Sequence, residues 1–280
     1  SSYCRTFTDT KANKRHCPGY LESIIKKMNK KFLLFLTACV NPQGMAFTVL
    51  QNPQIRLEQY LKSITYYLTK TDFDILLVEN SGYDFLPHFK EYAKNKRIEI
   101  LSFNGNGYNK ALGKGYGEGL IIKYAFNHSS FINNHDYIVK ITGRHIVTNI
   151  KQILGGVFFF HHFNKRTVSA ALNLNEKVAY SEVFVASPEF YSLYFLKRLN
   201  EINDSRGIFF EHILYEAISE SRLYGYMFIH VPFAVRQLGI SGSTGVKLDS
   251  SQSVLQDLKS FAKCVLYICR QDRLISKLQQ

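Results

Sequence analysis

The sequence predicts an α/β protein in which a mostly parallel β-sheet is flanked by helices, with a C-terminal helical extension. Apolar runs long enough for buried strands alternate along the chain with segments whose apolar residues recur at helical spacing. Hydrophobic residues make up 46% of the 280 residues, enough to build a large core. Lys and Arg exceed Asp and Glu by 35 − 22 = 13, which favours anionic partners such as phosphates, nucleic acid or an acidic lipid surface.

Composition also argues against a membrane-spanning protein and against a disulfide-rich secreted protein. The sequence contains no run of about 18 uncharged apolar residues and no N-terminal signal with a cleavage site, so we expect a cytoplasmic location. The alternative is the inner face of the cytoplasmic membrane. The 5 cysteines form no CxxC pair, which argues against a disulfide framework and against a structural zinc site.

The chain should divide into three parts. These are a basic N-terminal arm with a short helix over 1–31, an α/β domain over 32–247, and an amphipathic helix over 248–280. Within the domain, apolar runs at 32–40, 73–78, 97–103 and 137–141 predict four strands, with helices over 55–68, 87–95 and 120–128. Strands joined through such helices are parallel because crossover connections are right-handed.

Polar side chains follow these strands at the ends where an open parallel sheet binds its ligands. The candidate residues of this edge are Thr37, Asn41, Glu79, Asn80, Ser81, Lys140, Thr142, Gly143 and Arg144. We interpret them as a ligand site, since three successive strand ends carry them.

A glycine-rich segment, 104–119, lies between the third strand and the helix that follows. Its order of residues matches neither a Walker A loop nor a Rossmann fingerprint. It contains Lys110 and Lys114, and we expect it to be a loop that faces an anion.

The second half predicts helices over 149–162, 188–200 and 207–218, and strands over 167–172, 183–186 and 228–235. The segment that follows, 236–247, contains glycines, hydroxyl side chains and cations. It is either a loop that cradles a phosphate or a solvated linker. The cradle residues would be Arg236, Ser241, Gly242, Ser243 and Thr244. The helical tail, 253–278, has three possible partners: the core, another subunit, or an acidic membrane surface. We favour the core or a subunit.

This order of elements, with "VENS" at 78–81 and "DYIVKITGR" at 136–144, resembles the N-terminal half of GT-A-fold glycosyltransferases, in particular the bacterial enzymes that build lipopolysaccharide, O-antigen and capsule. The resemblance covers 32–245 in order and position. It implies a nucleotide-sugar donor on 32–147, a UDP-sugar first and a CMP-sugar as the alternative, and a glycan or glycolipid acceptor on 148–247. It also implies that Glu79 contacts the base or ribose.

The sequence departs from the family at the fourth strand. There the family usually has DxD, whose carboxylates hold a divalent cation, whereas this strand ends with Lys140, Thr142 and Arg144. We therefore expect no metal cofactor, and expect Lys140 and Arg144, helped by Lys110 or Lys114, to stabilise the leaving group. The alternative is Mn²⁺ or Mg²⁺ held by ligands elsewhere, such as Asp136 or His230.

Glu211, at the start of a predicted helix, corresponds in order to the family's catalytic base. A carboxylate there can accept the proton of the attacking hydroxyl. His212 or His230 would replace it if Glu211 were structural. The competing function is a basic nucleic-acid-binding protein without catalytic activity. We do not expect nucleic acid as a partner, because the sequence has no recognisable zinc finger, RNP motif or repeat.

Overall fold

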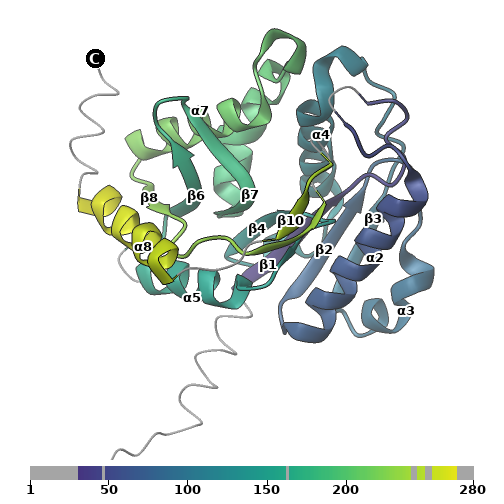
Figure 1. Cartoon of the computed structure of the whole chain (residues 1–280), viewed down its shortest axis with the longest axis horizontal. Helices are drawn as coiled ribbons and strands as arrows, with labels where there is room; N and C mark the ends of the chain where they lie inside the picture. Colours follow the sequence, from purple (N-terminus) through teal and green to yellow (C-terminus); the bar gives the residue numbers. More distant parts are fainter. Residues whose placement is uncertain (1–30, 46–47, 162–163, 241–244, 250–253, 270–280) are drawn as a thin grey trace, which may run out of the picture.

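The computed structural model describes residues 31–45, 48–161, 164–240, 245–249 and 254–269. In these ranges the chain forms a seven-stranded sheet covered by helices on both faces and a separate three-stranded sheet (Figure 1). The helix predicted within 1–31, and Ser241, Gly242, Ser243 and Thr244 of the predicted cradle, lie outside the described residues.

The first half builds a parallel sheet in the order β3-β2-β1-β4. Its strands are β1 (Phe32–Ala38), β2 (Asp74–Glu79), β3 (Ile98–Ser102) and β4 (Tyr137–Thr142). The connecting helices are α2 (Pro53–Lys70), α3 (Leu86–Lys94) and α4 (Gly113–His128). All of β1 is buried, which explains why its sequence is continuously apolar rather than alternating.

The second half extends the same sheet through β7 (Val178–Ala186), β6 (Thr167–Asn173) and β8 (Met227–His230). Strand β7 runs antiparallel to both β4 and β6, whereas β6 and β8 are parallel. The sheet is therefore mixed and mostly parallel, and the predicted α/β class with helices flanking the sheet is confirmed.

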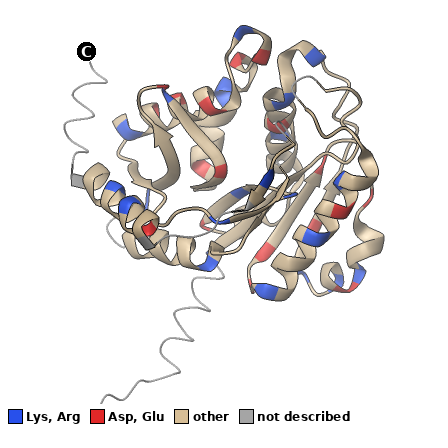
Figure 2. Ribbon diagram, in the orientation of Figure 1, with Lys and Arg blue, Asp and Glu red and all other residues tan. Residues whose placement is uncertain are grey.

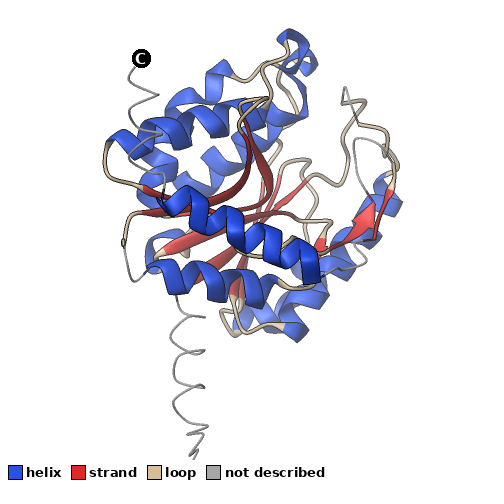
Figure 3. Cartoon of the chain, turned by 60° about the vertical axis from the view of Figure 1, so that its left-hand side comes forward, coloured by secondary structure: helices blue, strands red, loops and turns tan. Residues whose placement is uncertain are grey.

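Helices cover the two faces of the sheet with separate cores (Figure 3). Leu34 and Leu36 of β1 point to a core shared with α2, α3 and α5 (Ile150–His161). Leu33 and Phe35 point to the other core, shared with α4 and α7 (Phe210–Leu223). The alternation of side chains along β1 thus supplies both cores.

Two predicted elements differ in the structure. Helix α4 begins at Gly113, so much of the predicted loop over 104–119 is helical. A Cβ on Gly113 would lie 2.0 Å from Asp204, and the backbone of Gly113 has φ +84°. The helix predicted over 188–200 is α-helical only at Pro188–Phe190, then continues as a π-helix at Tyr191–Phe195 and a 3₁₀-helix at Leu196–Glu201. Both differences arise from tertiary packing, which overrides local propensity.

The end of the chain also differs from the prediction. The strand expected over 228–235 ends at His230, and part of 236–247 forms strands β9 (Gln237–Ile240) and β10 (Lys247–Asp249), which join β5 (Ile146–Val147) in the small sheet. Helix α8 (Val254–Cys269) packs on β8, so the tail contacts the core as favoured. None of the helices in the described ranges is long and apolar enough to cross a membrane.

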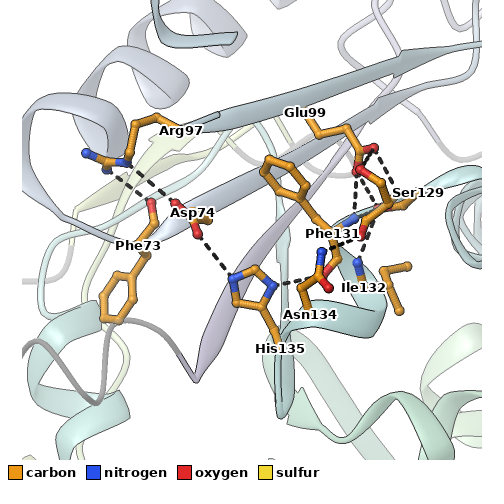
Figure 4. A network of polar contacts seen from close by, with 10 residues as sticks. Phe73, Asp74, Arg97, Glu99, Ser129, Phe131, Ile132, Asn134 and His135 are labelled. Carbon is orange, nitrogen blue, oxygen red and sulfur yellow. Dashed lines mark hydrogen bonds and ion pairs between the residues drawn. The ribbon is translucent and has the colours of Figure 1, made fainter. Parts of the chain in front are cut away.

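A polar network fixes the amino ends of β2, β3 and β4 (Figure 4). His135, just before β4, contacts Asp74 at the start of β2 at 3.3 Å and the Phe131 carbonyl at 2.8 Å. Arg97 donates to the Phe73 carbonyl at 3.1 Å and lies 3.7 Å from the Asp74 carboxylate. Glu99 of β3 accepts hydrogen bonds from the turn that follows α4. These contacts set the register of strands whose opposite ends form the site described below.

The contact between His135 and Asp74 predicts a pH-dependent contribution to stability. Burial alone would lower the pKa of His135, but hydrogen bonds with Asp74 and the Phe131 carbonyl outweigh it and raise the pKa. A raised pKa stabilises the fold fully below the unfolded value, about 6.5, and this contribution is lost as the pH rises through the folded pKa. We expect His135→Gln to reduce the free energy of unfolding by about 1 kcal/mol or less at pH 5.5, and by a smaller amount at pH 8. Urea unfolding at both pH values measures this difference; an equal loss at both would contradict it.

Candidate active site

The carboxyl ends of β1, β2 and β4 open into a cleft of about 280 Å³. Helix α4 and strand β7 with the start of α7 supply its other walls. Six of the residues predicted for the site line this cleft: Thr37, Asn80, Lys114, Thr142, Arg144 and Glu211. They come from segments far apart in the sequence, and the sheet brings them together.

A buried ion pair lies at the base of the cleft. Lys140 of β4 has no exposed surface, and its Nζ lies 2.6 Å from Oε1 of Glu118 on α4. Lys140 also donates to the Ser181 carbonyl of β7 at 3.1 Å, and Thr37 of β1 donates to Glu118 at 2.9 Å. The pair therefore connects four elements. Lys140 is not among the cleft-lining residues, so the direct role predicted for it does not follow from its position.

The charge of Lys140 keeps Glu118 ionised. Burial alone would raise the pKa of Glu118, but the charge of Lys140 and the hydrogen bonds from Lys140 and Thr37 hold that pKa below its usual value. Glu118 lines the cleft as a carboxylate that is already paired. It is thus available to position neighbours rather than to accept a proton.

Two buried side-chain amides from the first half of the chain line the cleft with oxygen atoms that accept no hydrogen bond from the described residues. Asn80, 3% exposed, and Asn106, 6% exposed, both line the cleft. Their Oδ1 atoms have no hydrogen-bond partner among the described residues. An unpaired buried acceptor costs about 1–3 kcal/mol, so these oxygens indicate a ligand that supplies N–H or O–H donors.

Fixed positive charge lies beside these amides. Arg144 is buried and donates through Nη1 to Gln59 and to the Ile240 carbonyl, each at 3.0 Å. Burial lowers the pKa of Arg144, although a guanidinium remains charged at neutral pH. Burial and the charge of Arg144 lower the pKa of neighbouring His145 to about 4, so His145 is neutral. The cation at this strand end is therefore Arg144.

Carboxylates face the cleft from the second half of the chain. Glu211, at the start of α7, accepts a hydrogen bond from Ser181 at 3.1 Å. Glu182 of β7 also lines the cleft, and part of its side chain is exposed. Burial of the rest raises the pKa of Glu182; the charge of Lys140 lowers this pKa, and the charge of Glu211 raises it, so the net shift is upward. A carboxylate with a raised pKa is a better proton acceptor, so the pair can do acid–base chemistry.

Several predicted residues do not line the cleft. Glu79 is fully buried, and its carboxylate accepts from the backbone N–H groups of Val40, Ser81 and Tyr83 at 2.8–2.9 Å. A contact from this carboxylate to a base or ribose would break those bonds, so the expected contact is not supported by its position. Asn41 and Ser81 line a separate hollow of about 360 Å³.

The remaining predicted residues serve other contacts. Lys110 donates to the Asn106 carbonyl at 2.6 Å, and Arg236 pairs with Asp257 of α8, so neither reaches the cleft. A Cβ on Gly143 would lie 2.7 Å from the Thr37 carbonyl, so Gly143 permits β4 to approach β1. The described part of 236–247 does reach the site, because the Ile240 carbonyl holds Arg144.

The residues at the end of β4 do not fit a divalent metal. Thr142 and Arg144 stand there in place of carboxylates, and among the described residues no group of three His, Cys, Asp or Glu could hold an ion. The suggested substitute ligands lie elsewhere. Asp136 precedes β4 at its opposite end and pairs with Lys31, whereas His230 stacks on Tyr267 with ring centroids 5.8 Å apart. His212, the substitute base, accepts a hydrogen bond from the Phe209 N–H at 3.1 Å and does not line the cleft.

Sequence reasoning missed Asn106, Glu118, His145 and Glu182. Asn106 and Glu118 lie in the glycine-rich segment, of which only the lysines were interpreted as site residues. Glu182 lies in β7, and the strand predicted there began one residue later. A signal for Glu118 existed: a lysine inside a buried strand requires an acidic partner.

Comparisons with known proteins find only distant structural similarity. No family model matches the sequence, and no curated protein matches it. Among solved structures, a mannosyltransferase of S. cerevisiae in complex with GDP is 9% identical, with 87% of this chain and 85% of that chain covered and a TM-score of 0.40. A cytidylyltransferase of Leptospira borgpetersenii is 16% identical, with 89% and 94% covered and a TM-score of 0.38. A 4-diphosphocytidyl-2C-methyl-D-erythritol synthase of Anaerococcus prevotii is 10% identical, with 86% and 98% covered and a TM-score of 0.37.

The buried pair predicts an unequal effect of single and double substitutions. Glu118→Gln leaves the Lys140 charge buried without its counter-ion, so we expect a loss of about 3–5 kcal/mol in the free energy of unfolding. Replacing both residues, as Glu118→Gln with Lys140→Met, should recover most of that loss, because no unpaired charge remains. Urea unfolding of the three proteins measures the effect. A double variant no more stable than Glu118→Gln would show that the pair does not act as a unit.

Proposed function

We propose that this protein is a glycosyltransferase that moves a sugar from a nucleotide donor to a hydroxyl of a glycan. One observation carries the proposal. A single cleft combines unpaired amide oxygens and a fixed cation on one side with two carboxylates on the other. Group transfer between a phosphorylated donor and an alcohol requires these two kinds of surface next to each other.

The donor side would bind through Asn80 and Asn106. Their free Oδ1 atoms match the hydroxyls of a ribose and the N–H groups of a base, which supply the missing donors. Arg144 and Lys114 line the same cleft and would face the phosphates. A UDP-sugar is the first candidate and a CMP-sugar the second, following the resemblance of the sequence to GT-A enzymes.

Leaving-group charge would be stabilised by this chain's own cations. The end of β4 offers a guanidinium where metal-binding carboxylates would be needed, so no step is assigned to a metal. Arg144 is held by two hydrogen bonds before any ligand arrives, which reduces the reorganisation required during the reaction. Lys114 adds a second positive charge along the cleft.

The acceptor side would use Glu211 as general base. Its carboxylate lines the cleft and is oriented by Ser181. As the acceptor oxygen attacks the anomeric carbon, its proton passes to Glu211 and the bond to the donor phosphate breaks, with inversion. Glu182 lines the same cleft and adds a second carboxylate on the acceptor side. By the same resemblance, the acceptor belongs to a bacterial surface glycan or glycolipid.

Glu211→Gln should reduce kcat about 10²–10⁴-fold with little change in donor affinity, because the amide preserves shape but cannot take the proton. Glu182→Gln should cost less, since it removes only a neighbouring charge. Glu216→Gln, on an exposed position of the same helix, is the matched control and should retain full activity. Release of nucleotide from a donor panel with glycan acceptors measures turnover. Wild-type turnover in Glu211→Gln would remove it as base, and a larger loss in Glu182→Gln would transfer the role to Glu182.

Nucleotides should stabilise the protein in the presence of EDTA. Binding at 100 times Kd adds about 2.7 kcal/mol to stability, so a shift in Tm should be measurable with UDP, GDP or CMP and their sugars. Arg144→Ala should weaken this shift and reduce turnover about 10²–10³-fold, whereas Lys151→Ala, exposed on α5, should not.

Two outcomes would contradict this account. Activity abolished by EDTA and restored by Mn²⁺ or Mg²⁺ would place a metal in the mechanism. Stabilisation by DNA or RNA oligonucleotides alone, with a steep salt dependence, would favour the nucleic-acid-binding alternative over an enzyme.

A further inference from the structure

Helix α8 has two apolar sides, and one of them packs on the sheet. Cys264 is buried in a small core with Met227 and Ile229 of β8, and Tyr267 packs on Phe228 with ring centroids 5.4 Å apart. Asp257, on the same side, binds the Arg236 guanidinium and the Ala234 N–H. These contacts attach the helix firmly to the sheet.

The opposite face of α8 carries large apolar side chains in solvent. Phe261 is 45% exposed but packs toward the core, where its ring centroid lies 6.4 Å from that of Phe160. The other exposed side chains are Leu255 at 58%, Leu258 at 61%, Val265 at 40% and Leu266 at 49%. At about 100° per residue these positions share one side of the helix, which we call the apolar stripe. An exposed apolar run of this kind marks an interaction site more often than chance.

Positive charge borders the apolar stripe. Lys259 lies one turn after Leu255, and Lys263 lies one turn before Leu266, and both are exposed. Figure 2 shows basic residues along α8. Asp257, an acidic residue of this helix, is already bound to Arg236 and so does not offset them. In sequence, Arg270, Arg273 and Lys277 follow the helix against Asp272, within a chain of net charge +13.

We propose that the apolar stripe of α8 binds an acidic membrane surface. The leucines and the valine would enter the boundary between headgroups and acyl chains, while Lys259 and Lys263 would extend their amines to anionic headgroups. The helix would lie in the plane of the membrane, with its Cys264 face still on the sheet. This inference does not depend on the proposed glycosyl transfer.

A second copy of the chain fits the stripe less well. Symmetric pairing of two α8 helices would bring Lys259 and Lys263 of both copies to one interface, where no free carboxylate of α8 is described to balance them. Like charges brought together in this way oppose association. An anionic lipid surface supplies the missing negative charge.

Vesicle co-sedimentation of the whole protein tests the proposal. Binding should be strong to vesicles of phosphatidylcholine with phosphatidylglycerol, weak to phosphatidylcholine alone, and reduced by 0.5 M NaCl because salt screens the lysines. Leu258→Gln with Leu266→Gln should weaken binding at least about ten-fold. Lys259→Gln with Lys263→Gln should weaken it about 25-fold, since each lysine near an anionic surface contributes about five-fold.

The matched control replaces exposed leucines elsewhere. Leu193→Gln with Leu223→Gln removes side chains that are 41% and 46% exposed outside α8, and should leave vesicle binding unchanged. The lysine variant keeps the test valid if the leucine variant misfolds, because both lysines are exposed. Equal binding to neutral and anionic vesicles, loss of binding in the control, or no vesicle binding together with a dimer that Leu258→Gln dissociates would each overturn the proposal.

Discussion

The buried pair of Lys140 and Glu118 is the interaction on which the rest of this structure depends. A lysine in a central strand has no access to water, so its charge requires a partner nearby. Glu118 meets that requirement from α4, and the Thr37 hydroxyl and the Ser181 carbonyl complete the arrangement from β1 and β7. The parallel first half of the sheet and β7, its first antiparallel strand, are thus joined at one point. The cleft lies directly above it.

Helix α4 must lie close to the sheet for this pair to form. Gly113, Gly115, Gly117 and Gly119 are all buried in α4 and allow Asp204, Phe210, Tyr108 and Leu199 to approach its backbone. The main role of the glycine-rich segment is therefore to permit close packing. It places Glu118 against Lys140 and leaves Lys114 at the mouth of the cleft.

The two ends of the strands have opposite characters. At the amino ends, Asp74, His135, Arg97 and Glu99 bind one another or the backbone, as suits a structural edge. At the carboxyl ends, Asn80 and Asn106 retain unpaired oxygens, and Glu182 and Glu211 share a cleft with Arg144. Leaving polar groups unpaired costs stability, so two unpaired amide oxygens in the lining of one cleft indicate a binding site. Glycosyl transfer is the chemistry that we propose for this combination of groups.

The amino-acid sequence alone determined the class of the fold and the edge of the sheet at which the candidate site lies, because buried strands and amphipathic helices have distinct apolar periodicities. The sequence placed Thr37, Asn80, Arg144 and Glu211 at the end of a predicted strand or the start of a helix, and in the structure all four line one cleft. Only the tertiary structure decided which polar residues line the cleft and which bind other groups of the protein. It turned Glu79 inward to bind backbone N–H groups, paired Lys140 with Glu118 and Arg236 with Asp257, and brought Asn106 and Glu182 into the cleft. The reason is that a polar side chain's partner is set by distance in space between segments far apart in the chain, which local sequence patterns do not contain.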